Sequence, residues 1–381
     1  MILLSEVTHA QDAAACAAKI LLALSAPHRI AQHNLHLTAS IGIVTYPDDG
    51  TDAETLMKHA DFAMYHAKDS GRNNYQSFEP DMNSRALERQ SLESGLRHAI
   101  ERQQLALHYQ PIVDLHTDAI SGVEALIRWR HPARGLVLPA QFVPIAEESG
   151  FIVAIGRWVL REACRQARAW QDAGLPQIRI AINISAVELC DKDFVAGVRA
   201  ILMDTGLAPR DLELELTETF LMRDSKSIAA VLHALKDLGV QLALDDFGTG
   251  YSSLSHLKRF PIDTLKIDQG FVRDLANNAD DASIVRAVIS MGKSLHMRVV
   301  AEGVEKPEQL ELLQEQSCPE GQGHYFGKPV DAMEITQLLG RRAVDPRSPD
   351  GRTTRKASRE RVSATIAHRS PRPFVRRISG D

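Results

Sequence analysis

From Leu105 to Leu339, short apolar segments alternate with longer amphipathic ones, and this alternation constrains the fold more than any other feature. Short apolar runs bounded by turn residues are typical of buried strands, whereas the longer segments have apolar residues at helical spacing. We expect eight strands, at residues 105–109, 120–126, 178–184, 212–216, 241–244, 264–267, 298–301 and 324–326. We expect helices between them at residues 142–148, 155–173, 194–203, 227–238, 283–295, 307–316 and 332–339.

Eight strands with interleaved helices over about 240 residues match the size of an α/β fold of the (β/α)8 TIM-barrel type. A doubly wound open sheet is the structural alternative. Such a sheet normally has a glycine-rich phosphate-binding loop after its first strand. No such loop follows Leu105–Tyr109, so the sequence favours the barrel.

Residues 1–80 predict a second, smaller α/β unit, in line with two domains for 381 residues. Its expected strands and helices cover residues 1–7, 12–25, 35–44, 52–68 and 75–78. Residues 81–102 predict a charged connecting helix, with a plain linker favoured over a dimerising helix. The barrel domain is placed at residues 92–340.

The charge distribution separates an acidic body from a basic tail. Residues 341–381 contain 12 Lys and Arg and 4 Asp and Glu, so this tail has a charge of +8. The whole chain has a net charge of −5, so the rest of the chain has a charge of −13. An acidic body argues against a nucleic-acid polymer as partner. A solvated, disordered extension is the favoured interpretation of the tail, with binding to an anionic surface as the alternative.

The cysteines and the apolar runs indicate a compartment. The four cysteines have no CxxC spacing, so we expect reduced thiols. No apolar run reaches the roughly 20 residues that span a bilayer, and the start of the chain lacks the regions of a signal peptide. These features predict a cytoplasmic protein without a membrane segment.

Polar side chains follow most of the expected barrel strands at the point where each strand ends. They are Glu124, Arg128, Asn183, Glu215, Glu218, Asp245, Asp246, Lys266 and Glu302, and Gln322 lies just before the last expected strand. In a barrel these ends meet at one face, where the active site lies. Several carboxylates in one cavity cannot all ionise without cations. Oxygen ligands suit Mg²⁺ or Mn²⁺, whereas zinc would favour His or Cys. Two such ions about 3.5–4 Å apart are the usual design for phosphate-ester hydrolysis.

These motifs together resemble a known family. They are Glu124-Ala125-Leu126, Asn183-Ile184-Ser185, Glu215-Leu216-Thr217-Glu218, Asp245-Asp246-Phe247-Gly248-Thr249-Gly250, Lys266-Ile267-Asp268, Glu302-Gly303-Val304-Glu305 and Gln322-Gly323. In this order, they resemble EAL-domain cyclic-di-GMP phosphodiesterases. The resemblance implies a (β/α)8-type barrel whose first strand runs antiparallel. It also implies hydrolysis of cyclic di-GMP to linear pGpG with Mg²⁺ or Mn²⁺, and a homodimer through the barrel.

The resemblance also implies residue roles. The metal ligands would be Glu124, Asn183, Glu215, Asp245 and Asp246, with Asp245 bridging two ions. Lys266 would orient the attacking water, and Glu302 would be either the general base or a ligand of the second ion. Glu218 would hold the loop 245–251 in place. Substrate contacts would come from Gln110, Arg128 and Gln322, and the guanidinium fork of Arg128 suits a phosphate.

The N-terminal unit resembles the C-terminal half of a GGDEF (diguanylate cyclase) domain. The matching stretches are Thr38–Ile43, Ala60–Lys68 and Gly71–Tyr75. The signature motif itself is absent, so we expect no cyclase activity. The first strands of that fold are absent as well, so the resemblance implies an uncovered sheet edge, and we expect marginal stability or a chain that begins inside a longer protein. Two alternatives to the phosphodiesterase stay open: a catalytically silent receptor for cyclic di-GMP, and a barrel phosphodiesterase for another substrate. The complete set of implied metal ligands favours the enzyme.

Overall fold

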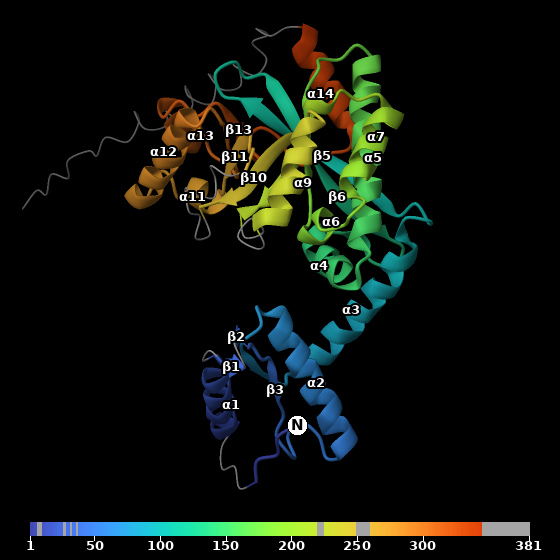
Figure 1. The fold of residues 1–381 in the computed structure, drawn as a ribbon, viewed down its shortest axis with the longest axis vertical. Helices are drawn as coiled ribbons and strands as arrows, with labels where there is room; N and C mark the ends of the chain where they lie inside the picture. Colours follow the sequence, from blue (N-terminus) through green and yellow to red (C-terminus); the bar gives the residue numbers. More distant parts are fainter. Residues whose placement is uncertain are drawn as a thin grey trace, which may run out of the picture. The chain divides into compact units, whose positions relative to one another are not determined.

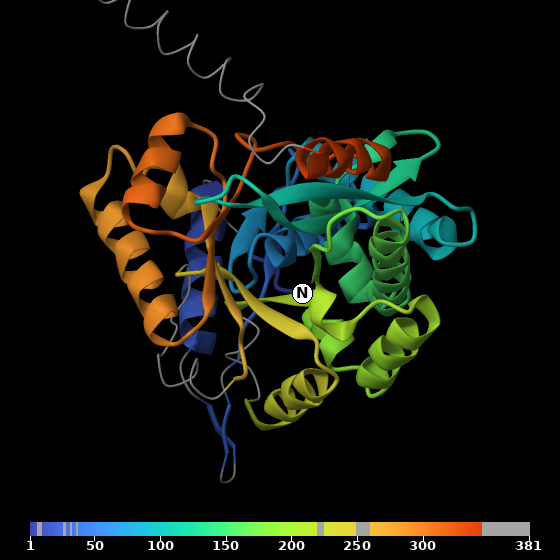
Figure 2. The ribbon, with the colours of Figure 1, turned by 90° about the horizontal axis from the view of Figure 1, so that it is seen from above.

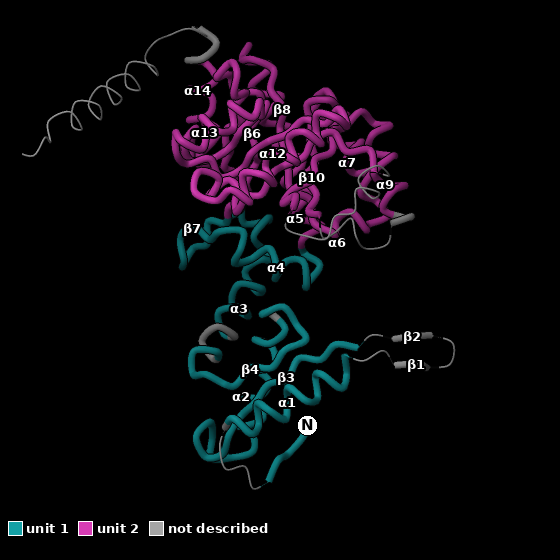
Figure 3. The backbone as a smooth tube through the Cα atoms, turned by 90° about the vertical axis from the view of Figure 1, so that its left-hand side faces the viewer, with its two compact units in different colours: residues 1–104, 129–151 teal, residues 105–128, 152–381 magenta. Residues whose placement is uncertain are grey.

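The computed structural model describes residues 1–5, 10–25, 28–30, 33–35, 37–218, 225–248 and 260–344. The chain divides into two compact units (Figure 3). One contains residues 1–104 and 129–151, and the other contains residues 105–128 together with those from 152 onward. The predicted tail beyond residue 344 lies outside the described residues.

The second unit is built around a closed ring of strands (Figure 1). Hydrogen-bonded neighbours follow the order β5-β13-β12-β11-β10-β9-β8-β6, and β6 pairs again with β5. The bounds are β5 Leu105–Asp114, β6 Ile120–His131, β8 Arg179–Asn183, β9 Leu212–Thr217, β10 Gln241–Phe247, β11 Thr264–Ile267, β12 Arg298–Ala301 and β13 Glu320–Gln322. The neighbours from β6 to β13 run parallel, whereas β5 is antiparallel to β13. The predicted (β/α)8-type barrel with an antiparallel first strand is therefore confirmed.

Helices of this unit lie outside the strand ring (Figure 2). They are α5 Ile152–Asp172, α6 Ala186–Leu189, α7 Phe194–Thr205, α9 Ser225–Asp237, α11 Gln269–Arg273, α12 Ala279–Ser294, α13 Pro307–Glu315 and α14 Ala332–Val344, with a 3-10 turn at Pro209–Asp211. Helices α5, α9, α12 and α14 pack against the strands, whereas α6 and α7 pack against α5. In α5, Ile155, Val159 and Ala163 are buried at four-residue spacing, which is the expected pattern for one core-facing side of a helix.

Inside the barrel, one thin apolar layer separates two polar ends. Ile112, Ala181 and Val300 form this buried layer. At the end where the parallel strands begin, Arg179 pairs with Glu320 at 2.6 Å, and Arg298 pairs with Glu213. Every second side chain of a strand points into the barrel. Beyond the apolar layer, the inward-facing residues are polar again, and they lie at the opposite end of the barrel. That opposite end contains the candidate site.

Four of the predicted barrel strands have bounds that differ from the structure by more than one residue. Strand β5 continues to Asp114 rather than ending at Tyr109, and β6 continues to His131 rather than ending at Leu126. The last strand is Glu320–Gln322 rather than 324–326, so Gln322 lies within a strand and not before it. Residues 324–326 form a turn in which the amide of Phe326 donates to the carbonyl of Gly323. Strand β10 continues to Phe247 instead of ending at Leu244, because a bulge between Leu244 and Phe247 accommodates the two aspartates.

The first unit contains two small sheets and several helices. The bounds are α1 Ala10–Ser25, β1 His28–Ile30, β2 His33–Leu35, β3 Ile41–Ile43, α2 Ala53–Asp69, β4 Tyr75–Ser77, α3 Pro80–Ala99, β7 Gly135–Val137 and α4 Pro139–Ser149. Strands β1 and β2 form an antiparallel pair, whereas β3 and β4 are parallel.

The strand predicted at residues 1–7 is not formed in its described part. Residues 1–5 have no regular structure and are exposed, and residues 6–7 lie outside the described residues. The apolar pattern of Met1–Leu4 indicates a strand only where a neighbouring strand is available to pair with it. Among the helices that the structure describes, none is both long and apolar enough to cross a membrane.

Candidate metal centre

The ammonium group of Lys266 lies at the centre of the polar end of the barrel. Its Nζ is 2.8 Å from Glu215 Oε2 and 2.8 Å from Glu302 Oε1. Asp245 Oδ1 follows at 3.4 Å and Glu124 Oε2 at 3.8 Å. These residues come from β6, β9, β10, β11 and the end of β12, so barrel closure brings together side chains that are far apart in sequence. Lys266 is 1 % exposed, and its charge is therefore shielded from water.

A chain of amides connects Glu124 to the neighbouring strands. Asn183 Nδ2 donates to Glu124 Oε1 at 2.6 Å, and Gln322 Nε2 donates to Glu124 Oε2 at 2.5 Å. Gln322 Nε2 also lies 3.1 Å from Gln110 Oε1, and Gln110 donates to the carbonyl of Gly327. The structure thus brings Gln110, Asn183 and Gln322 to the same end of the barrel as the carboxylates.

Asp245, Asp246 and Glu302 form the group most open to a metal ion. One carboxylate oxygen from each lies within 4.8 Å of the others. The bulge in β10 turns Asp246 into the left-handed region, with φ of 54°, and Asp245 Oδ1 accepts the amide of Asp246 at 3.0 Å. In a strand without a bulge, the side chains of two adjacent aspartates would point to opposite faces of the sheet. The bulge is the reason that both reach the site.

Negative charge dominates this centre. Glu124, Glu215, Asp245, Asp246 and Glu302 oppose one ammonium, so the formal charge is −4 if every carboxylate is ionised. Although burial opposes the charged lysine, the surrounding carboxylates hold the pKa of Lys266 well above its usual range. Burial and the neighbouring carboxylates raise the pKa of Glu215. Burial and like charges raise the pKa of Glu302 to about 8 and that of Asp246 to about 6.

Glu124 differs from these carboxylates. Burial alone would raise its pKa, but Lys266 and the two amide donors lower it. Glu124 is therefore the carboxylate that the protein itself stabilises in the ionised form. The raised pKa values of its neighbours indicate charge that the described residues do not neutralise.

The residues present fit divalent cations. Glu215 Oε1 is buried and has no hydrogen-bond donor among the described residues. The available ligands are carboxylate and amide oxygens, which suit Mg²⁺ or Mn²⁺. Two divalent cations carry four positive charges, the number that would balance the cluster.

Glu218 and Arg128 lie beside this centre. Glu218 is 3 % exposed, and its Oε2 accepts the amide of Gly248 at 3.0 Å, so it holds the chain just after the two aspartates. The rest of the predicted loop, residues 249–251, lies outside the described residues. Arg128 is buried, and its Nη1 donates to the carbonyl of Ile127 at 2.8 Å. Burial lowers the pKa of Arg128, partly offset by Glu124, which places this guanidinium in the field of the cluster.

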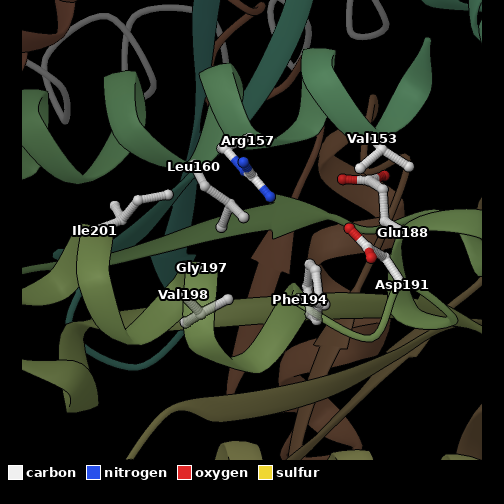
Figure 4. A pocket seen from close by; sticks show the side chains of 9 residues that line it. All are labelled: Val153, Arg157, Leu160, Glu188, Asp191, Phe194, Gly197, Val198 and Ile201. Carbon is white, nitrogen blue, oxygen red and sulfur yellow. The ribbon is translucent and has the colours of Figure 1, made fainter.

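A separate hollow lies between α5, α6 and α7 (Figure 4). Apolar side chains dominate its lining, and the polar ones are Arg157, Glu188 and Asp191. None of the metal-centre residues lines it. The converging oxygen ligands at the strand ends, and not this hollow, therefore define the candidate site.

One residue near the centre is missing from the sequence-based set. Gln309 is 2 % exposed, and its side chain bonds to the backbone of the segment that follows Glu302. A glutamine at the third position of a helix, after Pro307 at its start, is a recognised sign of capping. That signal was available in the sequence, whereas the hydrogen bonds of Gln309 to Val272 and Arg273 required the fold.

Comparison with known proteins agrees with this geometry. The family model "EAL domain" matches residues 93–329, and "Diguanylate cyclase, GGDEF domain" matches residues 1–74. A Pseudomonas aeruginosa protein named bifunctional diguanylate cyclase/cyclic di-GMP phosphodiesterase MucR is 47% identical over 334 residues, 88% of this chain and 49% of that protein. Escherichia coli cyclic di-GMP phosphodiesterase PdeR is 40% identical over 327 residues, 86% of this chain and 49% of that protein.

Solved structures show the same barrel. One described as PaMucR phosphodiesterase in a c-di-GMP complex is 47% identical, with a TM-score of 0.63, and covers 64% of this chain and 99% of that one. This chain spans about half the length of the curated relatives named above. The EAL model accounts for more than half of the sequence, and the chain belongs to the EAL domain family.

Proposed function

We propose that this protein hydrolyses cyclic di-GMP to linear pGpG with the help of Mg²⁺ or Mn²⁺. The observation that carries the proposal is the set of buried carboxylates around Lys266, whose negative charge calls for divalent cations. The substrate is suggested by relatives that are named cyclic di-GMP phosphodiesterases and by the solved c-di-GMP complex at 47% identity.

The metal ligands would be Glu124, Asn183, Glu215, Asp245 and Asp246. Asp245 would contact both ions, since it lies 3.4 Å from the central Lys266 and also within the Asp246–Glu302 group. When bound, the ions would supply positive charge that stabilises the phosphoryl transition state. Asn183 and Gln322 would keep Glu124 oriented through their amide hydrogen bonds.

The remaining residues would handle water and substrate. Lys266 would orient the attacking water and, together with Glu302, would control where its proton goes. Glu302 Oε1 lies 2.8 Å from Lys266 Nζ, beside the position proposed for the water, which suits Glu302 as the general base. Its place in the Asp245–Asp246 group equally suits it as a ligand of the second ion.

Arg128 would bind a phosphate through its planar guanidinium. Gln110 and Gln322, which already contact each other, would contact the substrate beside Glu124. Glu218 would hold the loop 245–251 in position through the amide of Gly248.

Product analysis tests this function. The full chain would be incubated with cyclic di-GMP and Mn²⁺, and the products would be separated by chromatography. We expect pGpG from the wild type and more than ~100-fold less from Glu124→Ala and Asp245→Ala. The surface variant Asp172→Asn is the control and should match the wild type. Tight binding of cyclic di-GMP without pGpG would overturn the proposal in favour of a silent receptor.

The N-terminal unit would have no cyclase activity, because the GGDEF signature is absent from its sequence. We propose domain limits at residues 1–80 for this GGDEF-like part, 81–102 for the connecting helix, 92–340 for the phosphodiesterase and 341–381 for the basic tail. The homodimer and the cytoplasmic location stay predictions of the sequence.

A further inference from the structure

We propose that Gln309 is a positioning residue that holds Glu302 against Lys266. This inference rests on the proposed function for its catalytic consequence, although its structural basis is independent. Gln309 is the third residue of α13 and is 2 % exposed, so its amide must find partners inside the protein.

The side-chain amide of Gln309 connects two segments of the chain, each of which follows a metal-centre residue. Its Oε1 accepts the amides of Glu305 and Lys306, both at 2.8 Å. Its Nε2 donates to the carbonyls of Val272 at 3.1 Å and Arg273 at 3.2 Å, the last residues of α11. The first segment follows Glu302, and the second follows Lys266. All the hydrogen-bonding capacity of the side chain is therefore used to connect them.

The same two segments also meet by close backbone packing. Gly303 has φ of 68°, and a Cβ added there would lie 2.6 Å from Gln269 Cβ at the start of α11. Val304 is fully buried, and its amide donates to the carbonyl of Gln322 at 3.0 Å. The loop after Glu302 is therefore fixed by α11 on one side and by β13 on the other, with Gln309 closing it at its far end.

The Lys266–Glu302 pair lies between these fixed points. Its separation of 2.8 Å depends on how the end of β12 sits relative to β11. The backbone hydrogen bonds between β12 and β11 hold the two strands together only as far as the bond from the amide of Glu302 to the carbonyl of Ile267. Beyond that bond, the loop position relies on the glycine contact, on the hydrogen bond from the amide of Val304 to the carbonyl of Gln322, and on Gln309. Loss of the Gln309 amide should displace Glu302 without unfolding the barrel.

Substitution of Gln309 in the full chain tests this role, with a matched change on the same helix as control. Gln309→Met removes all four bonds at nearly constant volume. Gln314→Met is the control, since Gln314 Nε2 donates only to the carbonyl of Leu115 at 2.8 Å, away from the centre. Calorimetric Mn²⁺ binding provides a readout that does not depend on turnover, and steady-state kinetics at saturating Mn²⁺ provides the second.

For Gln309→Met we expect Mn²⁺ affinity to fall ~10- to 100-fold, as for other groups that orient metal ligands. We expect kcat to fall ~10-fold with KM within ~2-fold, since the lost interaction acts on the chemical step. Gln314→Met loses one hydrogen bond instead of four, so it should lose less thermal stability, and it should keep both quantities within ~2-fold of the wild type. If Gln309→Met loses only thermal stability and keeps its Mn²⁺ affinity and kcat, the proposal is wrong.

A second variant keeps the test decisive if Gln309→Met does not fold. Gln309→Glu keeps the two accepted bonds to the loop and loses the two donated to α11, so we expect a smaller loss of Mn²⁺ affinity in the same direction. Unchanged Mn²⁺ affinity in this variant would equally contradict the role. If the wild type itself does not hydrolyse cyclic di-GMP, the proposed function fails, and the Mn²⁺ titrations alone decide the inference.

Discussion

Lys266 and Glu215 form an ion pair of 2.8 Å in which neither side chain is more than 1 % exposed. A buried ion pair costs desolvation free energy that its own attraction barely offsets. Here the lysine also faces Asp245 and Glu302, so one cation restrains several carboxylates at once. We infer that Lys266 stabilises the metal-free barrel in addition to the role toward water that we propose for it.

Replacement of this cation should therefore destabilise the metal-free protein. Lys266→Met leaves buried carboxylates without a counter-charge, and we expect a loss of about 3–5 kcal/mol in the free energy of unfolding at neutral pH. Lys236→Met, which removes a half-exposed pair with Asp263, should cost only about 1 kcal/mol. Urea unfolding of both variants, stripped of metal, measures the difference. Equal losses would show that the buried cluster needs no internal cation.

The binding of metal should depend on pH in a defined direction. In the metal-free protein, the raised pKa values of Asp246, about 6, and Glu302, about 8, mean that both carry protons at low pH. A metal ion binds the ionised carboxylates and must displace these protons, so affinity rises with pH. Between about pH 6 and 8 we expect roughly a tenfold gain in Mn²⁺ affinity per pH unit for each proton displaced.

Calorimetric titration in buffers of different ionisation enthalpy measures both the affinity and the number of protons released. Glu302→Gln provides the control, because it removes the group that titrates at the upper end of this range. The dependence between pH 7 and 8 should then flatten. Mn²⁺ affinity that does not change with pH in the wild type would contradict the assignment of these carboxylates.

Glu218 should act through the metal rather than through the fold. Its bond to the amide of Gly248 fixes the chain immediately after Asp245 and Asp246. For Glu218→Ala we expect the Mn²⁺ concentration for half-maximal turnover to rise ~10-fold. Loss of a residue that positions metal ligands typically lowers metal affinity by about this factor. Glu218→Gln keeps an oxygen that can accept the Gly248 amide and should stay closer to the wild type. An unchanged Mn²⁺ titration in Glu218→Ala would remove this role.

Calcium should inhibit turnover. Ca²⁺ binds the same oxygen ligands, but it prefers longer bonds and looser geometry than Mg²⁺. With Ca²⁺ in place of Mn²⁺, we expect retained binding of cyclic di-GMP and turnover at least ~10-fold lower. The comparison requires only product analysis at matched ion concentrations. Equal turnover with Ca²⁺ would show that strict octahedral geometry is not needed at this centre.

The sequence predicts the barrel well where periodicity and packing agree. Strands β11 and β12 have the predicted bounds, because each is short and contains buried apolar residues, Leu265 and Ile267 in β11 and Val299, Val300 and Ala301 in β12. Strand β13 is misplaced because Glu320 and Gln322 point into the polar interior, so the strand has no apolar signature. Its existence is decided by pairing with β12 and β5, which is tertiary information.

The candidate site can likewise be predicted from the sequence only in part. The order of polar residues at strand ends predicts which side chains converge, and the structure brings these side chains together. The central place of Lys266 and the bulge that directs Asp246 depend on strand register, which a single sequence does not reveal. For Gln309, the capping bonds to Glu305 and Lys306 are local, but the bonds that join it to the end of α11 connect residues more than 30 positions apart and depend on the fold.

The most direct test of the account is a Mn²⁺ titration of the metal-stripped full chain with cyclic di-GMP as substrate. The account predicts no pGpG before the ion is added, and turnover that reaches its maximum when two ions are bound per chain. It also predicts that Asp246→Asn weakens binding of one of the two ions. Full turnover by the chelator-treated protein would contradict the claim that the carboxylates around Lys266 act by holding divalent cations.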